Sequence, residues 1–276
     1  MNPRAALRIK DLAIWLLLAV GGVLTIVPFL WMIATALKAP GTEFDLPIRL
    51  IPDPLVWRNF PDAWQAVPFG RFFINSIVVA GLTALGQLVT GSMAGYAFAR
   101  LRFPARDALF LLYLGTMMIP PQVLLIPLFV LIRLLGWFNT FEALIMPGLF
   151  SAFAVFIMRQ FFLTVPEELE DAAIVDGANH WQIFFRVMLP LAGPSLATLA
   201  TFAFLSAWNS FLWPLVATNT LEMRPVTVGL AVFRDNFSTQ WTLLMAGTVI
   251  ATLPVIIVFL VGQRFFVRGI TMTGIK

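Results

Sequence analysis

The sequence predicts an all-α membrane protein with six transmembrane helices. Its 276 residues are 60% hydrophobic and only 12% charged, whereas a soluble domain has about 25% charged residues. The apolar residues lie in runs long enough to cross a bilayer, which takes about 20 residues of helix. Residues 164–190 are the exception, because this segment holds five of the 14 acidic residues in the chain.

Six apolar runs follow one another along the chain. The first is too long for the apolar core of a cleaved signal peptide, and Pro28 within it is tolerated in a membrane helix, with a kink expected. Pro120, Pro121 and Pro127 predict that the third helix is bent or broken. The predicted spans are residues 12–37, 72–99, 108–132, 141–162, 191–217 and 241–263.

The connections between these spans indicate how the chain is oriented. Residues 38–71 are polar and proline-rich, which predicts an ordered external loop, and residues 226–237 are expected to form a surface helix. Six spans place both termini on one side, which has eleven of the 18 Lys and Arg residues, against seven on the other side. The positive-inside rule therefore places both termini and residues 164–190 in the cytoplasm, with the chain in the cell (inner or plasma) membrane.

The second predicted span carries a pattern of small residues. Gly91 and Gly95 are four residues apart, so they lie on one face of a helix, and Ala94 lies beside them. Such a face allows a neighbouring membrane helix to approach closely.

Residues 164–190 predict two short helices joined by a glycine. Pro166 suits a first helical turn, where its missing N–H is not needed. Gly177 is the expected left-handed terminator of the first helix, and Asn179 with Gln182 matches a capping box that opens the second. The first helix has a small, nearly smooth face of Leu169, Ala172, Ala173 and Asp176, and the second has an apolar face of Ile183, Phe184, Val187 and Met188. An amphipathic helix pair between two spans is suited to be held by another protein.

The spacing within this segment resembles the EAA loop of ABC importer permeases. It reads Asp171-Ala172-Ala173, three residues, Gly177, nine residues, Val187, one residue and Leu189-Pro190. The family form has Glu in place of Asp171 and usually Ile in place of Val187, so the carboxylate here is one methylene shorter. In that family the loop is the cytoplasmic coupling helix that docks into a cleft of the ATPase subunit. The resemblance implies that the ATPase-coupling residues are Glu170, Asp171, Ala172, Ala173, Gly177, Leu189 and Pro190.

Further short motifs, in order along the chain, resemble carbohydrate importer permeases of the maltose type. They are Pro28-Phe-Leu-Trp-Met-Ile-Ala-Thr-Ala-Leu-Lys38, Asn75-Ser76, Ala94-Gly-Tyr-Ala-Phe-Ala-Arg100, Met118-Ile-Pro-Pro-Gln122, Trp208-Asn209 and Gly269-Ile-Thr-Met-Thr-Gly274. The tail is similar to that of the smaller of the two permease subunits in such systems. The resemblance implies the type I ABC importer permease fold and a solute that is a sugar or sugar-like: an oligosaccharide, a monosaccharide or glycerol phosphate.

The resemblance also implies the partners of the chain. They are a second, homologous permease subunit, a dimer of ATPase subunits and an extracytoplasmic solute-binding protein. No cofactor is expected in this chain, because ATP and Mg are expected on the ATPase; consistently, the sequence contains no phosphate-binding Gly-x-x-x-x-Gly-Lys-Ser/Thr pattern.

The composition weighs against other classes of function. There is no cysteine and a single histidine, His180, so neither a thiolate nor a histidine metal cluster is expected. The basic residues are not gathered into a patch that would bind nucleic acid. An ion-coupled carrier needs ionisable groups on its path, but the predicted spans hold only Glu142 and Arg159, each near an edge. A secondary carrier and a non-transporting membrane subunit remain the alternatives, and an enzyme is not expected.

Polar residues within or near the spans are candidates for contact with a solute. Amides and hydroxyls can pair with sugar hydroxyls, and an aromatic face can stack on a sugar ring. The same side chains also bridge helices in membranes, at about 1 kcal/mol or less each, and the sequence leaves both roles open. The candidates are Asn75, Gln87, Gln122, Ser206, Trp208 and Asn209.

Overall fold

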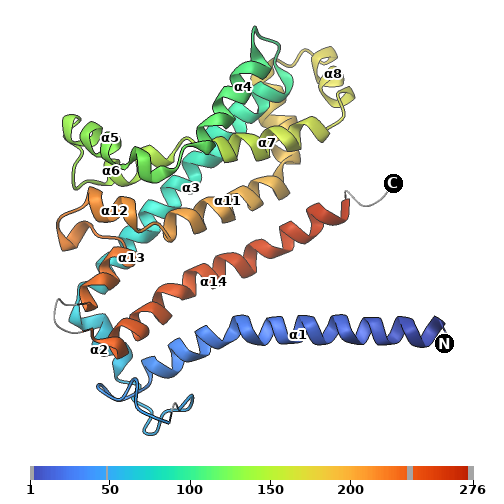
Figure 1. Ribbon diagram of the computed structural model, residues 1–276. Helices are drawn as coiled ribbons and strands as arrows, with labels where there is room; N and C mark the ends of the chain where they lie inside the picture. Colours follow the sequence, from blue (N-terminus) through green and yellow to red (C-terminus); the bar gives the residue numbers. More distant parts are fainter. Residues whose placement is uncertain (1–2, 48, 235–238, 273–276) are drawn as a thin grey trace. The chain divides into compact units, whose positions relative to one another are not determined.

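The computed structural model describes residues 3–47, 49–234 and 239–272. Within these ranges every named element is a helix (Figure 1), and Arg234 and Thr239 form an isolated bridge. The helices form two compact units, one of Met1–Phe69 with Leu230–Thr252 and the other of Gly70–Gly229 with Leu253–Lys276. The structure therefore confirms the all-α class.

The first unit contains α1 (Pro3–Ala36), α2 (Asn59–Ala66) and the beginning of α14 (Trp241–Met272). α1 runs through Pro28 without interruption, and its part Ile14–Ala36 is long and apolar enough to cross a membrane. Its large apolar side chains are exposed nearly all round. A helix that is hydrophobic on every side belongs in a core or a membrane.

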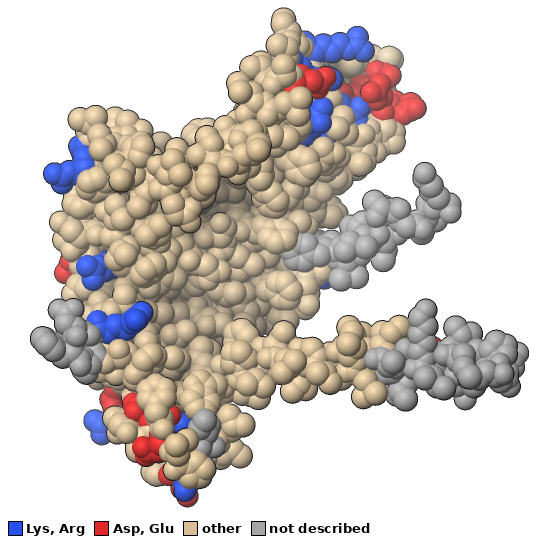
Figure 2. All heavy atoms as spheres, viewed as in Figure 1, with Lys and Arg blue, Asp and Glu red and all other residues tan. Residues whose placement is uncertain are grey.

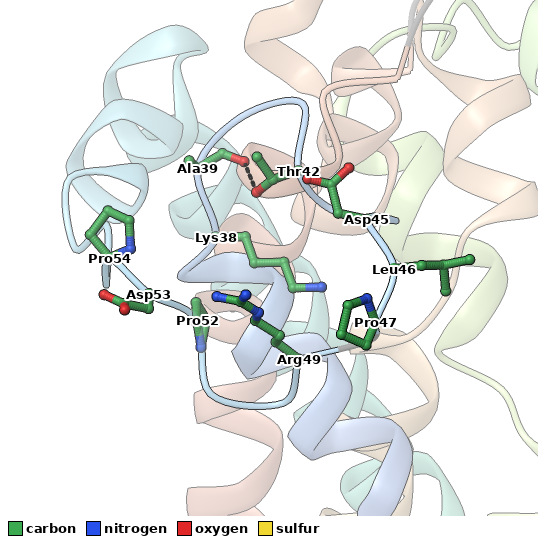
Figure 3. A pocket seen from close by; sticks show the side chains of 10 residues that line it. All are labelled: Lys38, Ala39, Thr42, Asp45, Leu46, Pro47, Arg49, Pro52, Asp53 and Pro54. Carbon is green, nitrogen blue, oxygen red and sulfur yellow. Dashed lines mark hydrogen bonds between the residues drawn. The ribbon is translucent and has the colours of Figure 1, made fainter.

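Hydrogen bonds order the loop that follows α1. The Asn59 side-chain Nδ2 donates to the backbone oxygens of Ala36 and Lys38, both at 2.8 Å. The buried Lys38 Nζ donates to the backbone oxygen of Glu43 at 2.8 Å and lies 4.7 Å from the centre of the Trp31 ring. The loop surrounds a pocket of about 290 Å³ whose charged lining residues are Lys38, Asp45, Arg49 and Asp53 (Figure 3).

The second unit is built along α3 (Phe69–Arg100), which α7 (Ala152–Thr164) follows closely. α7 also packs against α4 and α11. The other elements of this unit are α4 (Arg106–Gly115), η1 (Thr116–Met118), α5 (Pro121–Leu134), α6 (Phe141–Ile145), η2 (Met146–Gly148), α11 (Gly193–Trp208), α12 (Leu212–Ala217), η4 (Leu221–Met223), α13 (Val226–Gly229), the part of α14 from Leu253 onward and the helices around residues 168–191 described below.

The glycine pattern of α3 allows the close approach of α7. A Cβ atom at Gly91 would lie 2.7 Å from the Ala154 Cβ, and one at Gly95 would lie 2.6 Å from the Met158 Cβ. Neither distance is possible without a shift of the helices, so even alanine would separate them. Gly81, in the same helix, has open space around the corresponding position. This confirms the predicted close helix contact.

Two of the predicted spans are bent helix pairs. The segment formed by α4 and η1 meets α5 at an angle of 97°. This bend confirms the break predicted from Pro120 and Pro121. The segment formed by α6 and η2 meets α7 at 40°, a bend that was not predicted from the sequence. Here Pro147 and Gly148 form a short 3-10 turn, and the Ser151 hydroxyl caps α7 by accepting the N–H of Ala154 at 3.3 Å.

The predicted span 191–217 is also not one helix, because α11 ends at Trp208 and α12 begins at Leu212. Pro214 lacks the N–H that would bond the Ser210 carbonyl in a continuous helix. That carbonyl instead accepts a hydrogen bond from the Thr227 hydroxyl at 2.7 Å. The interruption therefore leaves the Ser210 carbonyl free to bind Thr227, 17 residues further along the chain.

The expectation of a surface helix over residues 226–237 is wrong for its first part. α13 (Val226–Gly229) is short and is followed by η5 (Leu230–Phe233), and both Val226 and Val228 are fully buried. The Val226 N–H donates to the Ser76 hydroxyl of α3 at 2.8 Å. Apolar side chains at both valines favour burial over a surface position. Residues 235–238, which include Phe237, lie outside the described residues.

Helix lengths and composition agree with a multi-span membrane protein. Three described helices are long and apolar enough to cross a membrane, and up to six crossings result if each bent pair counts as one. The last of the three, Trp241–Arg264, belongs to α14, which continues to Met272. The end of the tail motif, residues 273–274, lies outside the described residues.

Candidate coupling helix and translocation cavity

The acidic segment forms the predicted helix pair. α8 (Glu168–Val175) ends before Gly177, which has φ +81°, and α9 (His180–Ile183) follows. The capping box is complete, because the Gln182 N–H donates to Asn179 Oδ1 at 3.0 Å and the Asn179 N–H donates to Gln182 Oε1 at 2.9 Å. The local sequence signals therefore predicted this helix pair correctly.

The second half of the segment is anchored in the helix bundle. α9 continues into a π-helical turn, η3 (Phe184–Met188), and then α10 (Leu189–Leu191). Ile183, Phe184 and Met188 are buried in a core that includes Tyr96 and Phe162. This apolar face is the predicted one, and it fixes the position of Gly177.

α8 itself has no buried residue. Its apolar side chains Leu169, Ile174 and Val175 are exposed, Val175 to 88%. The acidic side chains of the segment gather over this helix on the face seen in Figure 2. An exposed helix with both apolar and acidic side chains, attached to an anchored base, is a surface that a partner protein can grip.

The predicted coupling residues lie on both parts of the segment. Asp171, Ala172 and Gly177 are exposed, whereas Ala173 and Leu189 are half-buried. A hollow of about 270 Å³ lies at the junction of the two helices and is lined by Ala173, Asp176, Gly177, Ala178, Gln182, Arg186 and Val187. Leu189 and Pro190 lie outside this lining and begin the short helix that leads back to α11, which is entered at 78°.

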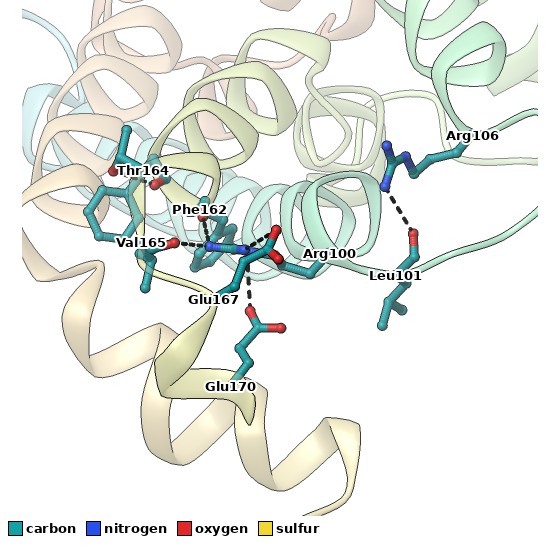
Figure 4. Close-up of polar contacts among 9 residues, drawn as sticks. Arg100, Leu101, Arg106, Phe162, Thr164, Val165, Glu167 and Glu170 are labelled. Atoms are coloured by element: carbon teal, nitrogen blue, oxygen red, sulfur yellow. Dashed lines mark hydrogen bonds and ion pairs between the residues drawn. The ribbon is translucent and has the colours of Figure 1, made fainter. Parts of the chain in front are cut away.

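Arg100 was not among the predicted site residues, yet it contacts the coupling segment directly. Its guanidinium group donates to the backbone oxygens of Phe162 (2.7 Å) and Val165 and pairs with Glu167 and Glu170 (Figure 4). The only sequence signals were its position at the end of a span and its membership of the 94–100 motif. Its partners lie more than 60 residues further along the chain.

A second arginine at this end of the bundle, Arg159, also binds residues of neighbouring helices. Arg159 donates from Nε to the backbone oxygen of Phe98 at 3.2 Å and from Nη2 to Asp107 Oδ1 at 3.3 Å. Its guanidinium carbon lies 4.2 Å from the centre of the Phe110 ring. Arg159 therefore joins α7 to α3 and α4, which is a structural role.

Two of the solute-path candidates line one cavity in the second unit. Its volume is about 230 Å³. Gln87 and Ser206 contribute to its wall, and Gln87 Nε2 also donates to the Gly148 backbone oxygen at 2.8 Å. Thr83 and Ser210 line it too, although the sequence analysis did not select them, and the buried Thr83 hydroxyl has no hydrogen-bond partner. The remaining lining residues are Val79, Leu144, Pro147, Gly148, Ala207, Trp213 and Pro214.

The other four candidates lie outside the lining of this cavity. Asn75 is fully buried, and its Nδ2 donates to the backbone oxygens of Glu222 (2.6 Å) and Arg224 (3.1 Å), which is a bridging role. Trp208 is buried against the rings of two phenylalanines. Asn209 is exposed after the end of α11, and Gln122 is exposed in the first turn of α5.

The described helices are those of a multi-span membrane protein with an exposed helix pair between two spans. Residues 87–272 match the family described as "Binding-protein-dependent transport system inner membrane component". The chain belongs to this family.

Three curated relatives match over most of their length. The probable ABC transporter permease protein YurM of Bacillus subtilis (strain 168) is 34% identical over 281 residues, with 100% of this chain and 92% of the relative covered. The arabinooligosaccharides transport system permease protein AraQ of Halalkalibacterium halodurans is 40% identical over 232 residues, or 83% of each chain. The sn-glycerol-3-phosphate transport system permease protein UgpE of Yersinia pestis is 33% identical over 268 residues, covering 94% of this chain and 95% of the relative.

Two solved structures share the fold. One chain of a bacterial ABC transporter involved in the import of the acidic polysaccharide alginate has a TM-score of 0.84 at 24% identity, covering 94% of this chain and 97% of that chain. A chain of the inward-facing MetNI methionine ABC transporter has a TM-score of 0.55 at 18% identity, covering 71% and 92%. The first match confirms the type I ABC importer permease fold.

Proposed function

We propose that this chain forms half of the path through which an ATP-driven importer carries a neutral sugar, and that α8 is its docking site for the ATPase. The observation that carries the proposal is α8 itself, an exposed helix without a buried residue that follows an anchored α7 and precedes an anchored α9. The partners would be a second homologous permease, a dimer of ATPase chains and an external solute-binding protein. ATP and Mg would be bound by the ATPase.

The coupling contact is proposed for the residues predicted from the sequence. Asp171 and Ala172 would face the ATPase directly, because both are exposed on α8. The hollow beside Ala173 and Gly177 would receive a side chain of the ATPase. Glu170 faces Arg100 within the permease, and Leu189 and Pro190 would support this surface where the chain returns to the bundle.

The cavity supports a neutral sugar over a phosphate ester. Among the described residues that line it, the polar groups are amides, hydroxyls and the Trp213 indole, and there is no Lys, Arg or His. Phosphate binding in proteins normally relies on such cations or on helix N-termini. A volume of about 230 Å³ is below the about 300–1,000 Å³ of typical ligand pockets, so a second permease subunit would complete the site.

We expect the assembled transporter to respond to neutral sugars and not to glycerol 3-phosphate. ATP hydrolysis would be measured in proteoliposomes that contain this chain, its partner permease, the ATPase and the binding protein. Arabino-oligosaccharides and simple monosaccharides would be compared with glycerol 3-phosphate at equal concentration. Stimulation by glycerol 3-phosphate alone would contradict the neutral-sugar assignment.

The proposed orientation places both termini and α8 in the cytoplasm. Because the chain has no cysteine, single cysteines can be introduced and labelled with an impermeant maleimide in right-side-out vesicles. A cysteine at Pro54 should be labelled, whereas cysteines at Ala5, Arg102 and Asn179 should react only after the membrane is opened. Asn236, expected outside, lies beyond the described residues. Labelling of position 102 or 179 in sealed vesicles would reverse the topology.

A further inference from the structure

Arg100 joins three helix ends at the base of the coupling segment. It is the last residue of α3, and its side chain is only 6% exposed. One amino group, Nη2, donates to the backbone oxygens of Phe162 and Val165 at the end of α7. Nη1 lies 3.4 Å from Glu167 Oε1 and Nε lies 3.2 Å from Glu170 Oε1, and both carboxylates belong to the start of α8 (Figure 4).

A guanidinium group is suited to this junction. The last carbonyls of a helix have no partner within the helix, and a cation beside them is favourable. Carboxylates are likewise favourable in the first turn of a helix. The planar group offers five donors in fixed directions, so it can serve the end of α7 and the beginning of α8 together. A lysine ammonium, as a point charge, cannot hold all four acceptors.

The two ion pairs differ in their environment. The Glu167 side chain is 85% exposed, so its pair with Arg100 is screened by water and contributes little. The Glu170 side chain is 15% exposed. Its pair with Arg100 therefore lies in a medium of lower dielectric constant, where the attraction is stronger and the loss of hydration is larger.

The buried pair is incompletely satisfied. Arg100 Nε and Glu170 Oε1 are within ion-pair distance but lack hydrogen-bond alignment, and the buried hydroxyl of Tyr96, one turn earlier in α3, also has no partner. Buried polar atoms without hydrogen bonds are rare in folded proteins, and each needs a reason. A junction that changes its arrangement during a working cycle would leave such atoms in one of its states.

Burial raises the pKa of the Glu170 carboxyl group above its ordinary value. Arg100 of α3 and His180 of α9 act against this rise, whereas Glu167 and Asp171 of α8 add to it. A carboxyl group with a raised pKa in the folded state stabilises the fold below its unfolded pKa, and this contribution is lost as the pH rises through the folded pKa. The folded state therefore favours the ionised form of Glu170 less than the unfolded chain does.

We propose that Arg100 is the positioning residue through which movement of α8 reaches the transmembrane helices α3 and α7. Because one buried guanidinium group holds all three helix ends, α8 cannot tilt without moving the cytoplasmic ends of the other two. The inference rests on the proposed docking of α8 on the ATPase. It adds the residue that transmits the movement within this chain.

The test compares two carboxylates that face the same guanidinium group. Glu170→Gln removes the charge on the side chain that is 15% exposed and leaves Arg100 bound to Glu167 and to the two carbonyls, whereas Glu167→Gln removes the charge on the side chain that is 85% exposed. The assembled transporter in proteoliposomes would be measured for solute taken up per ATP hydrolysed, for co-purified ATPase and for the melting temperature. Arg100→Lys would be measured in the same way.

We expect Glu170→Gln and Arg100→Lys to lower the uptake per ATP by between about twofold and thirtyfold, the range expected for residues that carry coupling between sites. Glu170→Gln should leave the ATPase bound, and Glu167→Gln should match the wild type. A wild-type ratio in both variants would overturn the proposal. So would a loss of uptake that follows a lowered melting temperature or a lost ATPase. Failure of the docking itself would appear separately, as an ATPase that stays bound after Asp171→Lys.

Discussion

Asp171→Lys should release the ATPase while this chain remains in the membrane at a near-normal level. Asp171 is exposed on α8 and forms no ion pair within the described residues, so the substitution removes only a favourable carboxylate from the first turn of this helix. In the proposed complex it would place a cation where the ATPase meets a carboxylate. Disrupting one partner of a buried charge pair costs about 2 kcal/mol or more, which lowers affinity more than about tenfold. Co-purification of the ATPase with the tagged permease measures this directly.

Gly177→Val should have the same result through the backbone. A Cβ at position 177 would have no atom within 4 Å, so the valine side chain would not clash. The backbone there has φ +81°, and this left-handed conformation costs a non-glycine residue about 1–2 kcal/mol. A β-branched residue is the least suited to it. The turn would relax and change the angle between α8 and α9. Gly177→Asn is the matched control, because asparagine tolerates this conformation.

These two substitutions separate docking from folding. Both should reduce solute-stimulated ATP hydrolysis in the assembled complex, while Gly177→Asn and Leu50→Ala, in the loop after α1, should preserve it. Membrane levels of all four variants should be similar, because the altered positions are exposed. The assignment of the coupling helix fails if Asp171→Lys and Gly177→Val both retain wild-type ATPase binding and transport.

The coupling segment could be predicted in detail because its signals are local. Gly177 requires a left-handed turn and Asn179 with Gln182 forms a capping box, and each of these depends on residues at most three positions apart. The close approach of α3 and α7 was also predictable, because two glycines one turn apart produce it whatever helix they meet.

Several features that were not predicted depend on contacts between separate segments, although the bend before α7 coincides with a local turn at Pro147 and Gly148. The break between α11 and α12 involves the hydroxyl of Thr227, and the burial of α13 involves Ser76, which is 150 residues earlier. The two valines of α13 favour burial, but the sequence did not show that Ser76 of α3 would be the partner of this segment. The role of Arg100 was missed for the same reason, because both carbonyls that it holds lie on another helix.

The solute-path residues illustrate the limits of residue chemistry. An amide in an apolar helix can face a solute or bridge two helices, and the residue type alone does not distinguish these two roles. Asn75 is buried and donates to two carbonyls, whereas Gln87 donates to one and also lines the cavity. The structure therefore favours Gln87 and Ser206 as the positions to test.

Ser206→Trp should reduce transport strongly without releasing the ATPase. Ser206 is exposed on α11 and lines the cavity of about 230 Å³. An indole in place of the hydroxyl would occupy much of that space. It would also replace a polar wall by an apolar one. Uptake of the sugar in proteoliposomes should fall more than about tenfold, which corresponds to a barrier about 1.4 kcal/mol higher or more.

Ser206→Ala separates the loss of space from the loss of a hydrogen bond. It keeps the cavity open and removes only the hydroxyl, whose hydrogen bond to a sugar would contribute about 1 kcal/mol. The half-saturating sugar concentration should therefore rise by about fivefold or less, with little change in maximal rate. Leu215→Trp, an exposed position of α12 outside the lining, adds an indole to the same unit without filling the cavity. If Ser206→Trp transports as well as Leu215→Trp, the solute does not pass this cavity, and the path must follow another face of the permease.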